Sequence, residues 1–361
     1  MSDRQYLDTL GMWEAAAALP EQLPAALDRA RRAFGDAALP PGDAVRAVAA
    51  FGEGTGGTAC DVVAALAAPH LRVPFWVGHG AGVPAFVDDH TLVFAVSCGE
   101  GTDAVGAAQE AVARGARVVA VGSDGALADL AADAGLPWCP VTPEGPAARS
   151  ALGAATVPLL VALCSAGLVP DATASVAAAA AVLGRRRDAW LLPGGPAEEL
   201  ARHLGRTIPL VYGADGVGAV AARWWKARVN LNAKAPAFAA ALPELTYDEL
   251  AGWGQGGDVT RQAMSLVLLR HGGESPRTAG LFEAVRAATD EVMADVFEVR
   301  GEGDDDLCRF FDLALLGELV SLHLAGREGV DPGPVPAVDE ARAATGDGLE
   351  LGESKRTTEY L

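Results

Sequence analysis

The chain has 361 residues, 50% of them hydrophobic, which is enough for one or two sizeable cores and excludes disordered, collagen-like and knottin folds. Its net charge of −19, from 47 acidic against 28 basic residues, disfavours nucleic-acid and membrane partners. Five cysteines without CxxC spacing and a polar first segment without a signal peptide predict a reduced, cytoplasmic protein without a metal site.

Residues 1–40 predict a helical lead-in of one or two helices, broken by four prolines: Pro20, Pro24, Pro40 and Pro41. Residues 41–150 then alternate short β-branched runs with helical segments, the pattern of a parallel sheet built from crossover units. We expect strands at 44–51, 73–78, 92–97, 117–122 and 138–142, and helices near 58–68, 102–115 and 125–135. This pattern indicates a first α/β domain.

Residues 151–184 predict a helical connector. The stretch 150–170 carries no charge and is long enough to span a bilayer, but its small residues and Pro158 favour a buried or interface helix. Residues 185–343 alternate again and predict a second α/β domain, and residues 344–361 predict a disordered tail. In the second domain we expect strands at 188–193, 207–212, 264–270 and 295–300, and helices at 217–229, 276–293 and 304–325.

The two halves share a strand, a Gly-rich turn and a helix, in FGEGTGGTACDVVAAL and VYGADGVGAVAARWW. This duplication predicts two similar modules with clefts at the carboxyl ends of their strands. Gly52, Gly54 and Gly57 satisfy GxGxxG, but the next strand ends in Gly78 without the acidic residue that a dinucleotide site needs. No cofactor is therefore expected, and the turn either cradles one phosphate or packs tightly.

Several segments in order, among them GEGTGGTACD, VPAFVDDHTLVFAVSCGEGTDAV, IPLVYGADGVGAVAARWWKARVNLNAKAPAFAAALPEL and GVDPGPVPAVD, carry a family resemblance. The chain resembles the SIS-domain bifunctional phosphoglucose/phosphomannose isomerases from about residue 44 to 342. The resemblance implies two SIS subdomains, each a doubly wound, flavodoxin-like parallel sheet. It also implies a sugar-phosphate ligand and a homodimer.

The resemblance also assigns the catalytic positions, and this chain departs from the family at each. Leu231 stands where the family has its carboxylate base, and Tyr247 stands where it has the His that opens the sugar ring. Arg342 fills the position of a Lys, so the charge is retained but the group does not give up its proton. Glu244, Asp248 and Glu249 are the nearest carboxylates that could replace the base. His323 could replace the His if its helix faces the cleft.

For the sugar phosphate, the resemblance implies eight residues: Gly54, Gly56, Gly57, Ser97, Gly99, Glu100, Thr102 and Arg149. We expect Glu100 to occupy the anion pocket at the helix start near Thr102, paired with Arg149. The alternatives are that Glu100 is a solvated loop residue and that Arg149 caps the connecting helix.

Two functions follow. The first is aldose–ketose isomerisation of hexose 6-phosphates, as in the glucose-6-phosphate and mannose-6-phosphate isomerases of carbohydrate metabolism. The second is a catalytically inactive regulator or scaffold that binds a sugar derivative, which accounts for Leu231, Tyr247 and Glu100 together. A homodimer is also predicted from the uncharged stretch 150–170 and the helix that carries Trp224 and Trp225.

Overall fold

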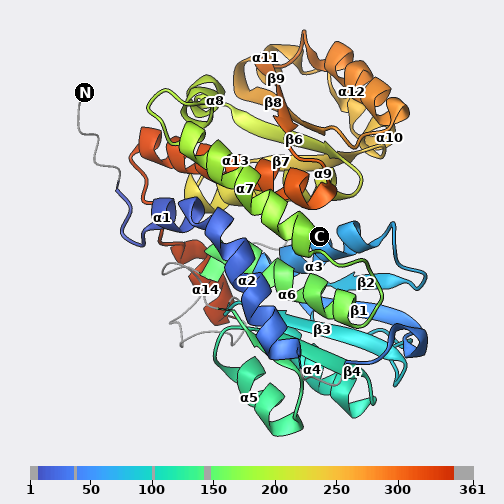
Figure 1. Ribbon diagram of the computed structural model, residues 1–361. Coiled ribbons are helices and arrows are strands. Elements are labelled where there is room, and N and C mark those ends of the chain that lie inside the picture. Colours follow the sequence, from blue (N-terminus) through green and yellow to red (C-terminus); the bar gives the residue numbers. More distant parts are fainter. Residues whose placement is uncertain (1–6, 36–38, 100–101, 142–147, 345–361) are drawn as a thin grey trace, which may run out of the picture.

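The computed structural model describes residues 7–35, 39–99, 102–141 and 148–344. It contains two parallel sheets, one from each half of the chain, with helices packed between and around them (Figure 1). The first sheet and its helices occupy the lower part of that view, and the second sheet occupies the upper part.

The first sheet has the strand order β2-β1-β3-β4-β5 with every pair parallel, which is the flavodoxin-like order. Its strands are β1 (Ala47–Gly52), β2 (Phe75–Gly78), β3 (Thr91–Ser97), β4 (Arg117–Gly122) and β5 (Trp138–Pro140). The helices that follow β1, β3 and β4 are α3 (Gly54–Ala67), α4 (Asp103–Ala113) and α5 (Ala126–Ala134). All five strands lie where the β-branched runs predicted them.

The second sheet repeats this arrangement with the order β7-β6-β8-β9, again all parallel. Its strands are β6 (Ile208–Ala214), β7 (Phe238–Leu242), β8 (Met264–His271) and β9 (Asp295–Gly301). Its helices are α9 (Val217–Asn232), α10 (Leu245–Asp248), α11 (Gly257–Ala263) and α12 (Pro276–Thr289). The predicted fold class, two doubly wound α/β subdomains, is confirmed.

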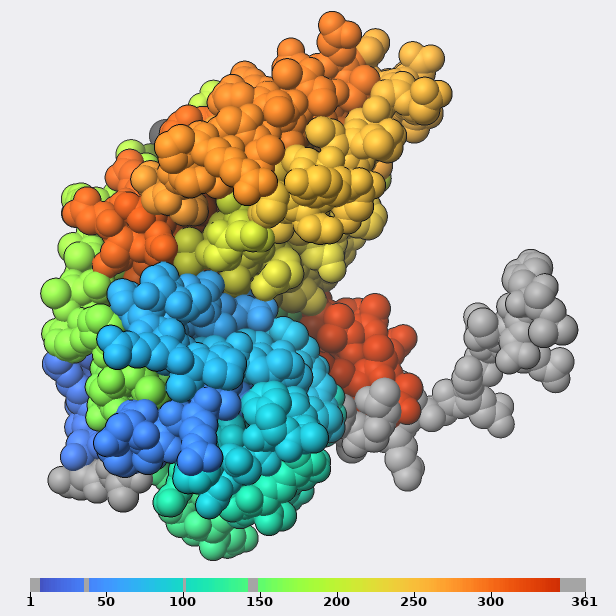
Figure 2. All heavy atoms as spheres, turned by 90° about the vertical axis from the view of Figure 1, so that its right-hand side faces the viewer, coloured from blue at the N-terminus to red at the C-terminus, as the bar shows by residue number. Residues whose placement is uncertain are grey.

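The remaining helices join the halves. They are α1 (Met12–Ala17), α2 (Leu19–Phe34), α6 (Leu152–Ser165), α7 (Thr173–Trp190), α8 (Pro196–Leu204), α13 (Asp306–Glu328) and α14 (Pro336–Ala344). Helix α13 packs on α7, α8 and α9, while α2 packs on α6, so one continuous apolar core runs between the two sheets. Helix α14 lies beside the first half although it comes last in the chain (Figures 1 and 2).

One strand predicted at the start of the second half is wrong. The segment 188–193 is the end of α7 and a turn, with Trp190 buried and Leu192 61% exposed. The preceding Ala- and Arg-rich residues favour a helix.

The lead-in forms two helices that are separated at Ala18, and Pro20 stands at the first positions of the second one, where its missing N–H costs nothing. Pro24 does not break α2 but lies inside it, close to its start.

Several elements of the second half were not predicted from the sequence, among them β7, α8 and the short helices α10 and α11. Strand β7 reads FAAAL, whose alanines have low strand propensity, and it lies at an edge of its sheet. Helix α8 begins with a proline at its first turn and has acidic residues there, which is a helix-start signal that was overlooked. The domain boundary expected at 184 falls inside α7.

The apolar segments that suggested a dimer are used within this chain. Helix α6 is buried from Leu152 to Leu163, and Trp224 and Trp225 are 4% and 1% exposed. They belong to the core between the two sheets. The homodimer therefore stays a prediction of the family resemblance alone.

Candidate functional site

A cavity of about 240 Å³ opens at the carboxyl ends of β3 and β4, where the doubly wound topology predicts a cleft. Ser97 and Gly99 reach it from the end of β3, Thr102 from the N-cap position of α4, and Ser123 from the turn after β4. Three residues of the sequence-predicted phosphate loop therefore line one cavity. Their hydroxyl groups and the start of α5 supply hydrogen-bond donors suited to an anionic or hydroxylated ligand.

Helix α14 adds the positive charge of this cavity. Arg342, in its last turn, lines the cavity together with Asp124 and Ala126, more than two hundred residues away in the chain. Figure 2 shows α14, in red, against the blue-green face of the first half. The family resemblance placed a cation at Arg342, and the structure brings it to the phosphate loop.

The glycine turn after β1 allows close packing of the backbone. A Cβ at Gly56 would lie 2.7 Å from the carbonyl oxygen of Val96, and one at Gly57 would lie 2.5 Å from that of Gly52. Gly54 has φ of 53°, in the left-handed region. The three predicted glycines thus let α3 approach β1 and β3 closely, and they do not line the cavity at β3 and β4.

Glu53, which the sequence analysis did not single out, takes the place expected of Glu100. Its Oε1 accepts the Ala104 N–H at 2.9 Å, so a carboxylate from the β1 turn caps the first turn of α4. Burial, reinforced by the charge of Asp103, raises the pKa of Glu53. Glu100 itself lies outside the described residues. A carboxylate directly after a Gly-rich strand end was the signal that could have identified Glu53.

Arg149 and Lys234 bind backbone carbonyls. Arg149 is 5% exposed and donates to the carbonyls of Pro332 and, at 2.8 Å, Gly333. Lys234 donates to the carbonyls of Leu231 and, at 3.2 Å, Pro332, while burial and the charge of Arg149 lower its pKa to about 8. These two cations hold the segment that leads into α14, and Arg149 is not among the residues that line the cavity at β3 and β4.

The two positions of the family's acid–base residues lie elsewhere. Leu231 lines a separate, mostly apolar cavity of about 480 Å³ with Lys234 and the start of α14. Tyr247 is 74% exposed on α10. The structure therefore does not bring Leu231 or Tyr247 to the cavity that holds Ser97 and Arg342.

The sequence-predicted substitutes for these groups are used structurally. Glu249 accepts a hydrogen bond from the hydroxyl of Tyr212. His323 is 8% exposed within α13 and packs edge-on against Trp13 with 4.7 Å between ring centroids. Neither residue lines the cavity at β3 and β4.

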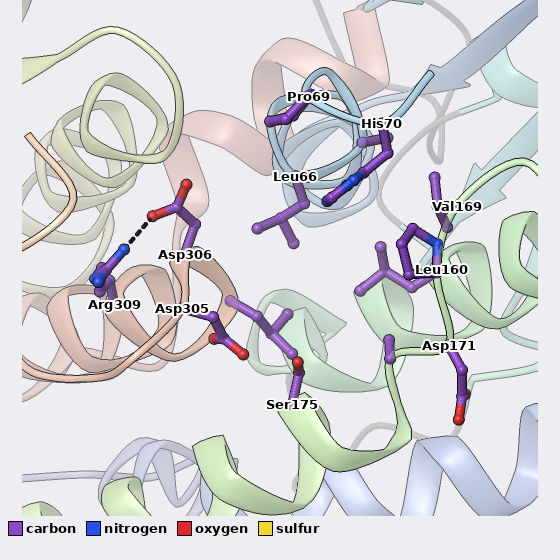
Figure 3. A pocket seen from close by; sticks show the side chains of 14 residues that line it. Leu66, Pro69, His70, Leu160, Val169, Asp171, Ser175, Asp305, Asp306 and Arg309 are labelled. Atoms are coloured by element: carbon purple, nitrogen blue, oxygen red, sulfur yellow. Dashed lines mark hydrogen bonds and ion pairs between the residues drawn. The ribbon is translucent and has the colours of Figure 1, made fainter. Parts of the chain in front are cut away.

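A further cavity of about 320 Å³ lies between the halves, walled by α3, α6, α7 and the start of α13 (Figure 3). Two of its carboxylates already have partners: Asp305 accepts the Cys308 N–H at the start of α13, and Asp306 pairs with Arg309 at 2.8 Å. Within the described ranges, no cluster of three His, Cys, Asp or Glu side chains could hold a metal ion.

Comparison with known proteins follows the same division of the chain. The bacterial phospho-glucose isomerase C-terminal SIS domain family matches residues 194–344. The bifunctional phosphoglucose/phosphomannose isomerase of Caldicellulosiruptor bescii is 28% identical over 334 residues, covering 91% of this chain and 97% of that protein. The chain is therefore similar to these isomerases over most of its length. The Aquifex aeolicus protein of the same name is 27% identical over 270 residues, covering 74% of this chain and 80% of its own.

Solved structures show the same SIS fold. The C-terminal domain of glucosamine-fructose-6-phosphate aminotransferase from Francisella tularensis superposes with a TM-score of 0.68 at 16% identity, covering 92% of this chain and 99% of its own. Tagatose-6-phosphate ketose/aldose isomerase from Escherichia coli gives 0.65 at 14%, covering 90% and 95%. Among the described helices of this SIS protein, none combines the length and hydropathy that a bilayer crossing requires.

Proposed function

We propose that the protein binds a phosphorylated hexose or a close sugar derivative in the cavity at the ends of β3 and β4. The observation that carries this proposal is the lining of that cavity, where Arg342 converges with the hydroxyls of Ser97, Thr102 and Ser123. A guanidinium with several hydroxyl donors suits a phosphate group and the hydroxyls of a sugar. Cytoplasmic localisation is part of the same proposal, supported by five cysteines that form no disulfide.

Turnover as an isomerase is proposed to be negligible. Moving a proton between C1 and C2 of an aldose needs a positioned base, and such a group contributes about 10²- to 10⁴-fold to the rate. Leu231 cannot carry a proton, and it faces a different cavity. The role that remains is that of a sugar-phosphate-binding regulator or scaffold.

An active isomerase is the second candidate. It is supported by the match to a bifunctional isomerase over 97% of that protein's length. The carboxylate available to it is Asp124, which lines the cavity beside Arg342. In an active enzyme, Asp124 would take the role of the missing base.

One pair of measurements separates the two candidates. Calorimetry with glucose 6-phosphate and mannose 6-phosphate should detect binding that Arg342→Ala weakens at least tenfold, since a charge-assisted contact is lost. Arg46→Ala is the control, because the exposed Arg46 lies at the opposite end of β1. Absence of binding to the wild-type protein would overturn the proposal.

The second measurement is a coupled assay of isomerisation from fructose 6-phosphate. We expect a rate far below about 1 per second, the lower end of ordinary enzymes. A rate at or above that value, abolished by Asp124→Asn, would establish the isomerase instead.

A further inference from the structure

A second strand-end cavity of about 250 Å³ lies in the other half of the molecule, at the carboxyl ends of β6 and β8. Ala214 and Asp215 line it after β6, His271 at the end of β8, and Arg277 and Thr278 in the first turn of α12. None of the sequence-predicted site residues belongs to this cavity.

The sheet registers show which positions of the two halves correspond. Gly52 of β1 pairs with Val96 of β3, and Gly213 of β6 pairs with Leu269 of β8. In both halves the next helix has its N-cap the same number of residues later, at Thr102 before α4 and at Ser275 before α12. The second residue of each helix then corresponds as well, Ala104 in α4 and Arg277 in α12.

The two halves differ in what the residue after the strand-end glycine does. In the first half this residue is Glu53, whose carboxylate accepts the Ala104 N–H. In the second half it is Ala214, and the Arg277 N–H has no acceptor among the residues that the structure describes. The first half thus places its own carboxylate on the second N–H of the helix. In the second half Ser275 caps α12 by accepting the Thr278 N–H, and the Arg277 N–H is left open to an anion.

His271 is an independent sign of a missing acceptor. Its side chain lines this cavity and the residue is only 8% exposed. Nδ1 accepts the Gly273 N–H at 3.2 Å, so in the neutral ring the proton is on Nε2. Nε2 is buried and has no hydrogen-bond partner among the described residues, which leaves an unsatisfied donor. Burial also lowers the pKa of His271, which keeps the ring neutral.

The charged groups that line this cavity are Glu274, Arg277 and Asp215. Glu274 pairs with the buried Arg270, with 2.8 Å between Nε and Oε2, and Arg270 also contacts Glu283 and Glu298. The exposed guanidinium of Arg277 makes no ion pair with the described residues and supplies the positive charge. Asp215 is exposed at the rim, and its carboxylate is a hydrogen-bond acceptor that suits the hydroxyl groups of a ligand.

We propose that the cavity at β6, β8 and α12 is a second ligand site, which binds a small phosphorylated polyol through Arg277, the start of α12 and His271. The proposal is independent of the function proposed for the first half. The two sites have no residue in common.

The test titrates the full chain with glucose 6-phosphate, and separately with inorganic phosphate, using imidazole NMR signals and calorimetry. Arg277→Ala should weaken binding at this site about tenfold, and Arg286→Ala, near the C-terminal end of the same helix, should not change it. Arg342→Ala should leave this site intact while it removes binding to the first cavity. Saturation should shift the His271 signal and raise its apparent pKa, because a bound anion stabilises the imidazolium.

The results either support or overturn the second ligand site. Binding that follows Arg277 and moves the His271 signal supports the site, and tighter binding of glucose 6-phosphate than of phosphate supports the polyol. Equal affinity for the two ligands would reduce the proposal to a phosphate site. Binding that follows Arg342 alone, or a His271 signal that does not move at saturating ligand, would overturn the second site even if the first-half proposal holds. Arg277 is exposed on a helix surface, so its replacement does not endanger folding.

Discussion

The turn after β1 and the turn after β6 pack equally closely on their helices, but only the first carries a carboxylate beside its glycine. In both, a glycine at the strand end touches the backbone of the following helix: Gly52 meets Gly57, and Gly213 meets Gly218. The next residue is Glu53 in one half and Ala214 in the other, and that exchange decides whether an adjacent helix terminus is filled. Packing constrains the glycines of the repeated module, whereas the residue beside them differs in chemistry between the two halves.

The cations of the molecule are used in two different ways. Arg149 of the first half and Lys234 of the second both donate to the carbonyl of Pro332 and hold the segment that leads into α14. Arg277 in the second half stands at a helix start and is exposed. A cation near a strand-end cavity therefore indicates a ligand site only when backbone carbonyls do not already bind it.

The largest expected effect is a loss of stability when the glycine that packs against the following helix is replaced by alanine. In Gly213→Ala the new Cβ would overlap the carbonyl group of Gly218, which is backbone and cannot swing away. We expect a loss of about 3 kcal/mol in the free energy of unfolding, measured by urea denaturation. Gly52→Ala should cost less, about 2 kcal/mol, because its Cβ would lie 2.8 Å from Gly56.

Gly184→Ala is the control for both glycines. It lies within α7 with nothing within 4 Å of the added Cβ, so alanine should stabilise by about 0.5–1 kcal/mol through helix propensity. If Gly213→Ala behaved like Gly184→Ala, the close approach would not constrain the second turn.

A reciprocal exchange tests the chemical difference. Ala214→Glu should place a carboxylate at the start of α12 and weaken phosphate binding at the second cavity at least tenfold. Glu53→Ala should free the Ala104 N–H and create anion affinity at the start of α4. Both are measured by calorimetry with phosphate. Ala214→Ser is the control, because it adds no charge and should leave phosphate binding intact. Unchanged phosphate binding in both Ala214→Glu and Glu53→Ala would show that these residues do not control anion binding at the helix starts.

How much of this the sequence could predict depends on the kind of contact involved. All five strands of the first sheet follow from local β-branched runs, whereas Ser97 and Thr102 were implied by the family resemblance. That Arg342 joins them was implied by the family resemblance alone, because no local pattern predicts where α14 packs. The roles of Glu53 and of the Arg149 contacts escaped prediction because each bond spans tens or hundreds of residues. Local periodicity does not encode such distances.

Lys234 tests whether a cation bound by backbone carbonyls has a lower pKa than an exposed lysine. Its pKa, lowered to about 8 by burial and by Arg149, means that about half of its amines are unprotonated at pH 8. Trace acetylation at that pH, followed by peptide mass spectrometry, should modify Lys234, which follows the end of α9, roughly fivefold faster than the exposed Lys226 within α9. Arg149→Ala should reduce the difference because it removes a neighbouring positive charge. Equal rates in the wild-type protein would contradict a lowered pKa.

The smallest effect concerns the two histidines beside the glycine turns. The hydrogen bond from His79 to Asp61 raises the pKa of His79, and burial lowers that of His271. Imidazole NMR titration should therefore place their midpoints on opposite sides of 6.5. The signs for stability differ too. His79 stabilises below pH 6.5 and loses this as pH rises through its raised pKa, whereas His271 loses stability as pH falls from 6.5 through its lowered pKa.

Asp61→Asn sharpens this last test because it removes the partner of His79. It also removes the ion pair of Asp61 with Arg223 of α9, at 3.0 Å, so Arg223→Gln, which removes that ion pair alone, is the control. The midpoint of His79 should fall toward 6.5 while that of His271 stays in place. The cost in stability should be below about 1 kcal/mol, since the His79 side chain is 54% exposed and solvent screens the pair. If both midpoints moved together, the two strand-end turns would be electrostatically coupled, and the contrast between a filled and an open helix terminus could no longer be assigned to Glu53 and Ala214 separately.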